Sequence, residues 1–86
     1  MKIIVCLLAG FIICSASLVF AKDAARAVSR GNKLYKENKF DQALELYDEA
    51  IMDKPDSVIV NFNKGAAYFK KEDFSAAIIS FEKALL

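Results

Sequence analysis

The residue types that most often carry out chemistry in proteins are sparse in this sequence. Its 86 residues include no histidine, and the two cysteines, Cys6 and Cys14, both lie in an apolar stretch near the start. The rest of the chain therefore has no thiol or imidazole for nucleophilic catalysis, no Cys/His zinc set and no disulfide. The neighbouring carboxylates Asp48 and Glu49 fit a solvated helix face, and no glycine-rich phosphate loop is present. The sequence predicts a protein that is not an enzyme and uses no cofactor or metal.

The charge balance narrows the class of partner. The chain has 12 Lys and Arg against 11 Asp and Glu. Because Lys2 precedes the apolar stretch and no other charged residue lies within it, the remainder carries equal numbers of each sign. A formally neutral chain argues against general nucleic-acid binding. Protein or peptide partners are the expected class.

The apolar stretch itself has the features of a signal peptide. Residues 3–21 carry no charge, follow Lys2 and end in small residues, with Val19 and Ala21 spaced like a signal-peptidase site. We therefore expect residues 1–21 to be a signal peptide cleaved after Ala21, and the mature protein to be periplasmic or secreted. The alternative is an uncleaved membrane anchor, because about 19 apolar residues nearly match the hydrocarbon core of a bilayer. The basic residues that follow also resist translocation under the positive-inside rule.

A fixed internal offset organises the remaining sequence. Residues of the same or similar type recur 34 positions apart, which indicates one supersecondary unit used twice. The matching pairs are Gly31 and Gly65, Phe40 and Phe74, Ala43 and Ala77, Tyr47 and Phe81, and Ala50 and Ala84.

Hydrophobic periodicity predicts four helices in this region. Apolar residues recur at helical spacing over residues 24–37, 40–53, 58–71 and 74–86. Asn38 is a candidate cap in the first turn, and Pro55 ends the second helix because proline disfavours the α region for the residue before it. Asp56 or Ser57 can then cap the third helix. The four helices form two similar hairpins.

These repeated positions resemble the tetratricopeptide repeat (TPR) family. The resemblance implies an all-α fold of two antiparallel helical hairpins, the start of an α-solenoid, preceded by the signal or anchor helix. Its boundaries would be 22–57 for a first repeat and 58–86 for a second that is incomplete at its C-terminal end. A generic helical bundle is the alternative. The residues expected to pack the repeats are Gly31, Ala43, Tyr47, Ala50, Gly65, Ala77, Phe81 and Ala84.

The small members of that set have a mechanical role. Gly31 and Gly65 would allow the first helix of each hairpin to approach the second, with Ala43 and Ala77 facing them, because a bulky side chain would force the helices apart. The aromatic pair Tyr47 and Phe81 would fill the space between layers, and Ala50 and Ala84 would admit the next repeat.

In TPR proteins the first helices of each hairpin line a concave face, which the resemblance implies as the binding surface here. Amides, cations and aromatics on that face suit an extended peptide or partner helix, and the cations favour an acidic one. Both asparagines could instead be general features of the repeat, and both phenylalanines could be core. A clamp for a terminal carboxylate is not favoured, because Val28 stands where that pattern has lysine. The expected residues are Asn32, Lys36, Phe62, Asn63, Phe69 and Lys70, with Val28 and Ser29 nearby.

The end of the sequence leaves a second surface. It stops at Ala84-Leu85-Leu86, short of a second proline turn. Arrays of this kind normally need about three repeats or a polar capping helix. We expect either that the chain is the amino-terminal part of a longer protein, or that Leu85 and Leu86 are covered by self-association or by a partner.

Together these features predict an exported TPR module that acts as a scaffold or adaptor in the cell envelope. The alternative is a membrane-anchored assembly factor that multimerises through its open helical end. The run Arg30-Gly31-Asn32-Lys33-Leu34-Tyr35-Lys36-Glu37, just behind the leader, looks like the small TPR proteins of bacterial aerotolerance (Bat) operons. That likeness implies a role in the bacterial envelope beside other products of the operon.

Overall fold

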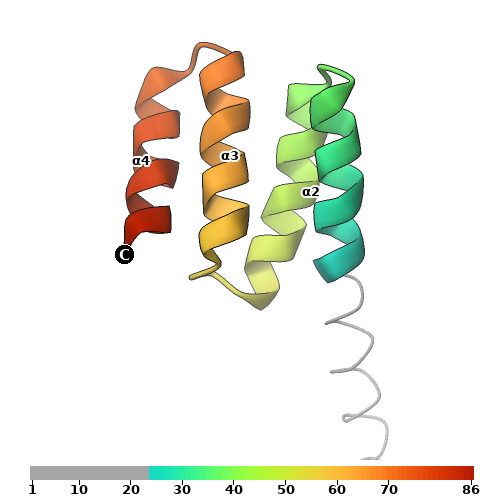
Figure 1. Cartoon of the computed structure of the whole chain (residues 1–86), viewed down its shortest axis with the longest axis horizontal. Coiled ribbons are helices and arrows are strands. Elements are labelled where there is room, and N and C mark those ends of the chain that lie inside the picture. The colour runs from blue at the N-terminus through green and yellow to red at the C-terminus, as the bar shows by residue number, and fades with distance from the viewer. Residues whose placement is uncertain (1–23) are drawn as a thin grey trace, which may run out of the picture.

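The computed structural model describes residues 24–86, and within them the chain is entirely helical. A helix over residues 24–36, the N-terminal helix, is followed by α2 (Phe40–Asp53), α3 (Val58–Lys70) and α4 (Phe74–Leu85). Figure 1 shows the four helices side by side in chain order, from the N-terminal helix across to α4. The all-α prediction is confirmed for this part of the chain. The predicted signal peptide, with cleavage after Ala21, lies outside the described residues.

The two hairpins close with the same turn. Asn38 and Glu72, 34 positions apart, both have positive φ, at 62° and 65°. In each turn the backbone N–H of the next residue donates back to the preceding helix, from Lys39 to Leu34 O at 2.9 Å and from Asp73 to Tyr68 O at 3.0 Å. This pattern is a Schellman motif, which ends a helix with one left-handed residue.

Asn38 therefore caps the C-terminal end of the N-terminal helix, and it is not the N-cap of α2. The N-cap of α2 is Lys39, whose side chain makes no capping bond. The prediction was ambiguous because asparagine suits both positions: it tolerates left-handed φ and also accepts bonds at helix starts.

The turn between the hairpins is held by two polar side chains. Ser57 caps α3 by accepting from the Val60 backbone N–H at 3.3 Å, as one of the two predicted candidates. Asn61 is buried, and its Nδ2 donates to the carbonyl oxygens of Pro55 at 3.1 Å and Ser57 at 2.9 Å. A buried amide that satisfies two turn carbonyls fixes where the second hairpin starts relative to the first.

The core is made of small residues around one aromatic ring. Tyr47, on α2, is the largest of its buried side chains and is 1% exposed. A Cβ added to Gly31 would lie 2.7 Å from the Tyr47 ring, and one added to Gly65 would lie 2.5 Å from the Phe81 ring. The glycines thus make room for the aromatic rings, rather than for the alanines expected from the sequence. The buried cluster contains Ala27, Ala43, Leu44, Tyr47, Ala50, Val60 and Ala67.

Ion pairs join the two hairpins where α3 meets α2. Lys64 Nζ lies 2.8 Å from Asp48 Oδ1, and Lys71 pairs with Asp41. The hydrogen bond that the Lys71 ammonium donates to Asp41 raises the pKa of Lys71. Asp48 is exposed to solvent, as the sequence predicts, and it also forms an ion pair with Lys64. The helices of residues 24–86 are all too short or too polar to cross a membrane.

Candidate peptide-binding pocket

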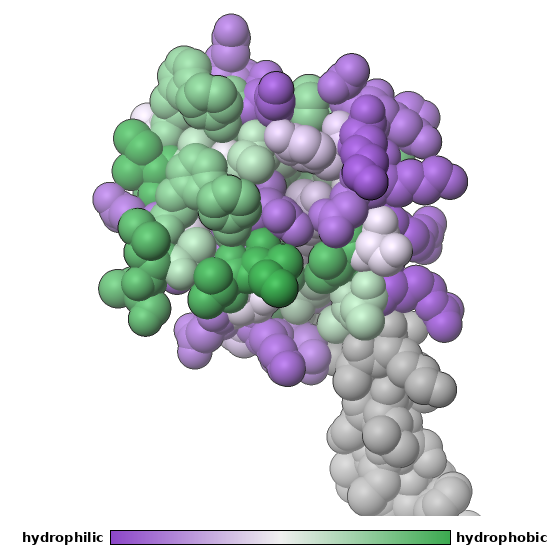
Figure 2. Space-filling view, viewed as in Figure 1, coloured by the Kyte–Doolittle hydropathy of each residue, from purple (hydrophilic) through white to green (hydrophobic). Residues whose placement is uncertain are grey.

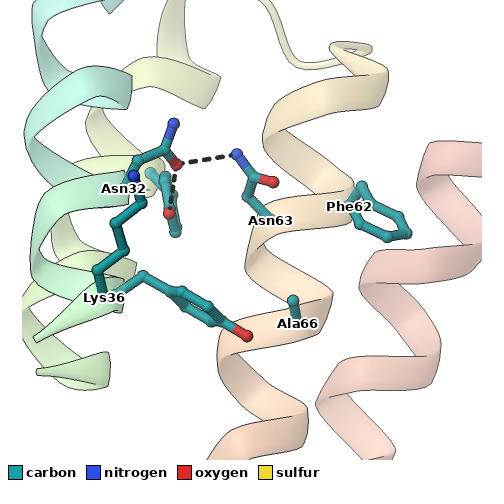
Figure 3. Close-up of a pocket in the computed structure, with 7 residues that line it drawn as sticks. Asn32, Lys36, Phe62, Asn63 and Ala66 are labelled. Atoms are coloured by element: carbon teal, nitrogen blue, oxygen red, sulfur yellow. Dashed lines mark hydrogen bonds between the residues drawn. The ribbon is translucent and has the colours of Figure 1, made fainter. Parts of the chain in front are cut away.

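A pocket opens between the N-terminal helix and α3. Its volume is about 380 Å³. Figure 3 shows Asn32 and Asn63 pointing toward each other from the two helices, while Phe62 points from α3 toward the next helix. The lining residues are Asn32, Tyr35, Lys36, Tyr47, Phe62, Asn63 and Ala66.

Asn32 organises the polar side of the pocket. Its Oδ1 accepts a hydrogen bond of 2.7 Å from the Tyr47 hydroxyl and one of 3.1 Å from Asn63 Nδ2 (Figure 3). These bonds link all three helices that line the pocket. Within residues 24–86 they leave Asn32 Nδ2 as a donor and Asn63 Oδ1 as an acceptor. One donor and one acceptor side by side match the bonding needs of a peptide backbone.

The Tyr47 hydroxyl is a hydrogen-bond donor at neutral pH, as an ordinary phenol is. Burial raises its pKa above the ordinary value of 10.0, and the nearby Tyr35 adds to the shift. A phenol that stays protonated at neutral pH donates to Asn32 and fixes the orientation of that amide. The acceptor side of Asn32 is thereby committed to the protein, and its donor side is available.

Aromatic and small side chains make the apolar side of the pocket. Phe62 stacks at a tilt on Phe81, with ring centroids 5.5 Å apart, and remains 57% exposed. Ala66 stands one helical turn beyond it and leaves the pocket open. A half-exposed ring held from behind by a second ring can receive an apolar side chain of a ligand.

Lys36 supplies the positive charge of the pocket. The other cations of the N-terminal helix lie on a different face of that helix, as the 34-residue offset shows. Arg26, Arg30 and Lys33 correspond to Val60, Lys64 and Ala67 of α3, the face that meets α2, so they occupy the outer end of the array. Of the cations of the N-terminal helix, Lys36 alone lines the pocket.

The pocket gathers four of the six residues predicted for binding: Asn32, Lys36, Phe62 and Asn63. Phe69 and Lys70 are exposed but are not among its lining residues, and Phe69 packs edge-on against Phe74. The nearby residues Val28 and Ser29 do not line it either. Both predicted phenylalanines touch another ring and yet stay exposed, so neither is core.

Tyr35, Tyr47 and Ala66 line the pocket and were missed. Tyr47 was assigned to packing because it lies on the second helix of its hairpin. A signal existed: in the second repeat Asn32 is replaced by Ala66 and Tyr47 by Phe81, so the amide and the hydroxyl are lost together. Paired losses of a donor and its acceptor indicate contact.

The residues predicted to pack the repeats occupy interior positions. Gly31, Ala43, Tyr47, Ala50, Gly65, Ala77 and Ala84 are buried, and Phe81 is half-buried. Ala27 and Asn61 are buried as well. Among the described residues, no group of three or more His, Cys, Asp or Glu side chains is placed to hold a metal ion.

An array of helical hairpins with a lined groove defines a helical-repeat protein of the kind that binds other proteins. Comparison with known families agrees. One model, described as TPR repeat, matches residues 31–72, and a second, described as tetratricopeptide repeat, matches residues 59–86. Residues 31–86 therefore contain tetratricopeptide repeats.

The chain is similar to known proteins over part of its length. It is 37% identical over 49 residues to the Hsp70-Hsp90 organising protein of Plasmodium falciparum, covering 57% of this chain and 9% of that protein. It is 33% identical over 48 residues to RNA polymerase II-associated protein 3 of Rattus norvegicus and of Mus musculus, covering 56% of this chain and 7% of those proteins. The chain thus spans less than a tenth of each relative. The likeness to Bat-operon proteins and the repeat boundaries 22–57 and 58–86 stay predictions.

Proposed function

We propose that the protein is an adaptor that holds a peptide segment of a partner protein in the pocket between the N-terminal helix and α3. The observation that carries the proposal is the Asn32–Asn63 pair beside an exposed ring and a lysine. The amides bond the ligand backbone, Phe62 receives an apolar side chain and Lys36 meets an acidic group. The name of one relative, an organising protein, fits an adaptor role.

The adaptor acts outside the cytoplasm, as a periplasmic or secreted protein of the cell envelope. The support is the uncharged stretch 3–21 behind Lys2 and the site-like spacing of Val19 and Ala21. Amino-terminal sequencing of the protein recovered from cells tests this part separately. A mature start at Lys22 supports export with cleavage. An intact Met1 in the membrane fraction favours the anchored assembly factor, and an intact Met1 in the cytosol contradicts both.

The pocket is tested by a pair of charge reversals that the repeat itself provides. Lys36 and Lys70 occupy equivalent positions 34 residues apart, and both are exposed, but Lys36 alone of the two lines the pocket. Partners captured by the full chain should be lost with Lys36→Glu and with Phe62→Ala, and retained with Lys70→Glu. Circular dichroism of each variant checks the fold. Partners that respond equally to Lys36→Glu and Lys70→Glu, or to neither, would remove the pocket as the binding site.

A further inference from the structure

The two asparagines of the pocket offer a ligand one kind of bond each. Asn32 Oδ1 already accepts from the Tyr47 hydroxyl at 2.7 Å and from Asn63 Nδ2 at 3.1 Å, so both of its lone pairs are used. Within residues 24–86 this leaves Asn32 Nδ2 to donate and Asn63 Oδ1 to accept. Turning both amides over would exchange the two roles and still leave one of each, because a hydroxyl donates as well as accepts.

The end of a peptide and its interior differ in what they can bond at this pair. A terminal carboxylate only accepts hydrogen bonds, so it would place its oxygens beside the Asn63 oxygen with no hydrogen between them. A peptide group inside a chain brings one N–H and one C=O, which satisfy the acceptor and the donor together. The free acceptor therefore favours the interior of a chain.

The charge of the pocket agrees with an internal segment. Of the seven lining residues that the structure describes, Lys36 alone is charged. Its counterpart Lys70 does not line the pocket, and Val28, one helical turn before Asn32, is apolar. One exposed lysine can meet one carboxylate. It suits a single acidic side chain better than a terminal carboxylate accompanied by one.

The polar and apolar groups lie on different sides of the asparagine pair. Lys36 comes from the N-terminal helix, and Phe62 comes from α3 and points toward the next helix (Figure 3). Figure 2 shows hydrophobic side chains gathered toward the α4 side of the molecule, and hydrophilic ones over the N-terminal helix. A segment that crosses the pocket therefore meets a cation before the amides and an aromatic ring after them.

We propose that the pocket binds an internal segment of its partner, with an acidic residue on one side of the bonded peptide group and an apolar residue on the other, and that it rejects a chain terminus. The inference rests on the proposed function, because it takes the pocket to hold a peptide. In an extended segment, side chains two residues apart point to the same side. The recognised pattern is thus an acidic residue, any residue and an apolar residue, and the Asn63 acceptor is what excludes the terminus.

The test uses synthetic fluorescein-labelled peptides as probes and the full 86-residue chain as the receptor. The probes are Gly-Ser-Glu-Ala-Leu-Ser-Gly and the opposite order Gly-Ser-Leu-Ala-Glu-Ser-Gly, both with an amidated end. Each is also made in a truncated form that stops at Ala, either as a carboxamide or as a free carboxylate. Fluorescence anisotropy should show saturable binding of one order. Its truncated carboxamide should bind about fivefold tighter than the carboxylate, and Asn63→Ala should remove that preference.

An N-methyl scan of the bound peptide locates the bonded peptide group. Methylation replaces one backbone N–H at a time, so a single position should weaken binding about fivefold, the usual worth of one hydrogen bond. The same methylation should cost nothing in Asn63→Ala, because the acceptor is already gone. Lys36→Glu should weaken every probe that carries the acidic residue. Lys70→Glu is the matched control and should change none of these affinities, with circular dichroism as the check of fold.

The outcomes separate this inference from the proposed function. A carboxylate form that binds the natural chain as tightly as the carboxamide overturns the inference and leaves the pocket as a peptide site. So does an N-methyl effect of equal size in the natural chain and in Asn63→Ala. Absence of saturable binding for both orders also overturns the inference, while the capture of partners with Lys36→Glu and Lys70→Glu decides separately whether the pocket binds a partner at all.

Discussion

The hydroxyl of Tyr47 donates a hydrogen bond of 2.7 Å to Oδ1 of Asn32, and this bond ties the core of the first hairpin to its binding pocket. The second repeat has neither partner, because Phe81 and Ala66 stand at the equivalent positions. The same aromatic ring thus packs between the two helices of each hairpin, with a hydrogen bond to the first helix in the first repeat and without that bond in the second. The repeat that has the Tyr47–Asn32 hydrogen bond is also the one whose residues line the pocket beside α3.

Removing this bond should cost a modest amount of stability. Tyr47→Phe should lower the free energy of unfolding by about 1 kcal/mol, the usual net worth of one hydrogen bond, since Asn32 is exposed and water can replace its donor. Combining it with Asn32→Ala recreates the Phe81–Ala66 pair. The double variant should lose less than the sum of the two single losses in urea unfolding. Strict additivity would show that the two side chains are not coupled.

The same tyrosine should make stability depend on alkaline pH. Its folded-state pKa is raised above 10.0 by burial and by Tyr35, so the neutral phenol is favoured in the folded chain. The stabilisation is therefore full below pH 10 and is lost as the pH rises through the raised folded pKa. Urea midpoints from about pH 8 to pH 11 should converge between the natural chain and Tyr47→Phe. A constant gap between the natural chain and Tyr47→Phe across this pH range would contradict the shift.

Alanine at the two interior glycines should have unequal costs. Gly31→Ala places a Cβ 2.7 Å from the Tyr47 ring, which is 1% exposed and has no room to move, so a loss of about 1–3 kcal/mol is expected despite better helix propensity. Gly65→Ala meets the Phe81 ring at 2.5 Å, but that ring is half-buried and can shift outward. Thermal melts should therefore rank Gly31→Ala as the more damaging. In a Tyr47→Leu background the penalty of Gly31→Ala should shrink.

The buried amide of Asn61 should matter more than that of Asn63. Asn61 is 2% exposed and its side chain bonds two carbonyls of the inter-hairpin turn. Asn61→Ala should cost about 1–3 kcal/mol because it removes both bonds and the side-chain donor of the Pro55 carbonyl, whereas the Ser57 carbonyl keeps the backbone N–H of residue 61 at 3.1 Å. Asn63→Ala, which removes a solvent-exposed hydrogen bond, should change stability by less than about 0.5 kcal/mol. Chemical denaturation of both variants provides the comparison. Similar losses would show that the turn is held by packing alone.

One substitution should stabilise the chain. Glu72 holds a φ of 65° in the second Schellman turn, where a side chain with a Cβ is strained. Glu72→Gly should raise the free energy of unfolding by about 0.5–1 kcal/mol. Asn38→Gly, at the equivalent turn, should change it little because asparagine tolerates the left-handed region. A destabilised Glu72→Gly variant would indicate that the glutamate side chain has a role beyond the turn.

Much of the fold could be predicted because its signals are local. Helical periodicity and the proline turn placed the four helices within a residue or so of α2, α3, α4 and the N-terminal helix. The 34-residue offset indicated which small and aromatic residues pack the interior of the repeats. Four of the six residues predicted for binding line the pocket, and their role in binding stays a prediction. The bond between Asn32 and Asn63 was not predicted, because the two residues lie 31 positions apart in sequence and meet only when α3 folds against the first hairpin.

Sequence alone determined the repeat, the helices and the chemistry that the chain can offer. Tertiary structure decided which of two equivalent residues does what. Lys36 lines the pocket and Lys70 does not; Leu44 is buried by α3 and its counterpart Ile78 is exposed. The physical reason is that local patterns repeat with the sequence, whereas burial depends on which helix lies alongside, and the two hairpins have different neighbours.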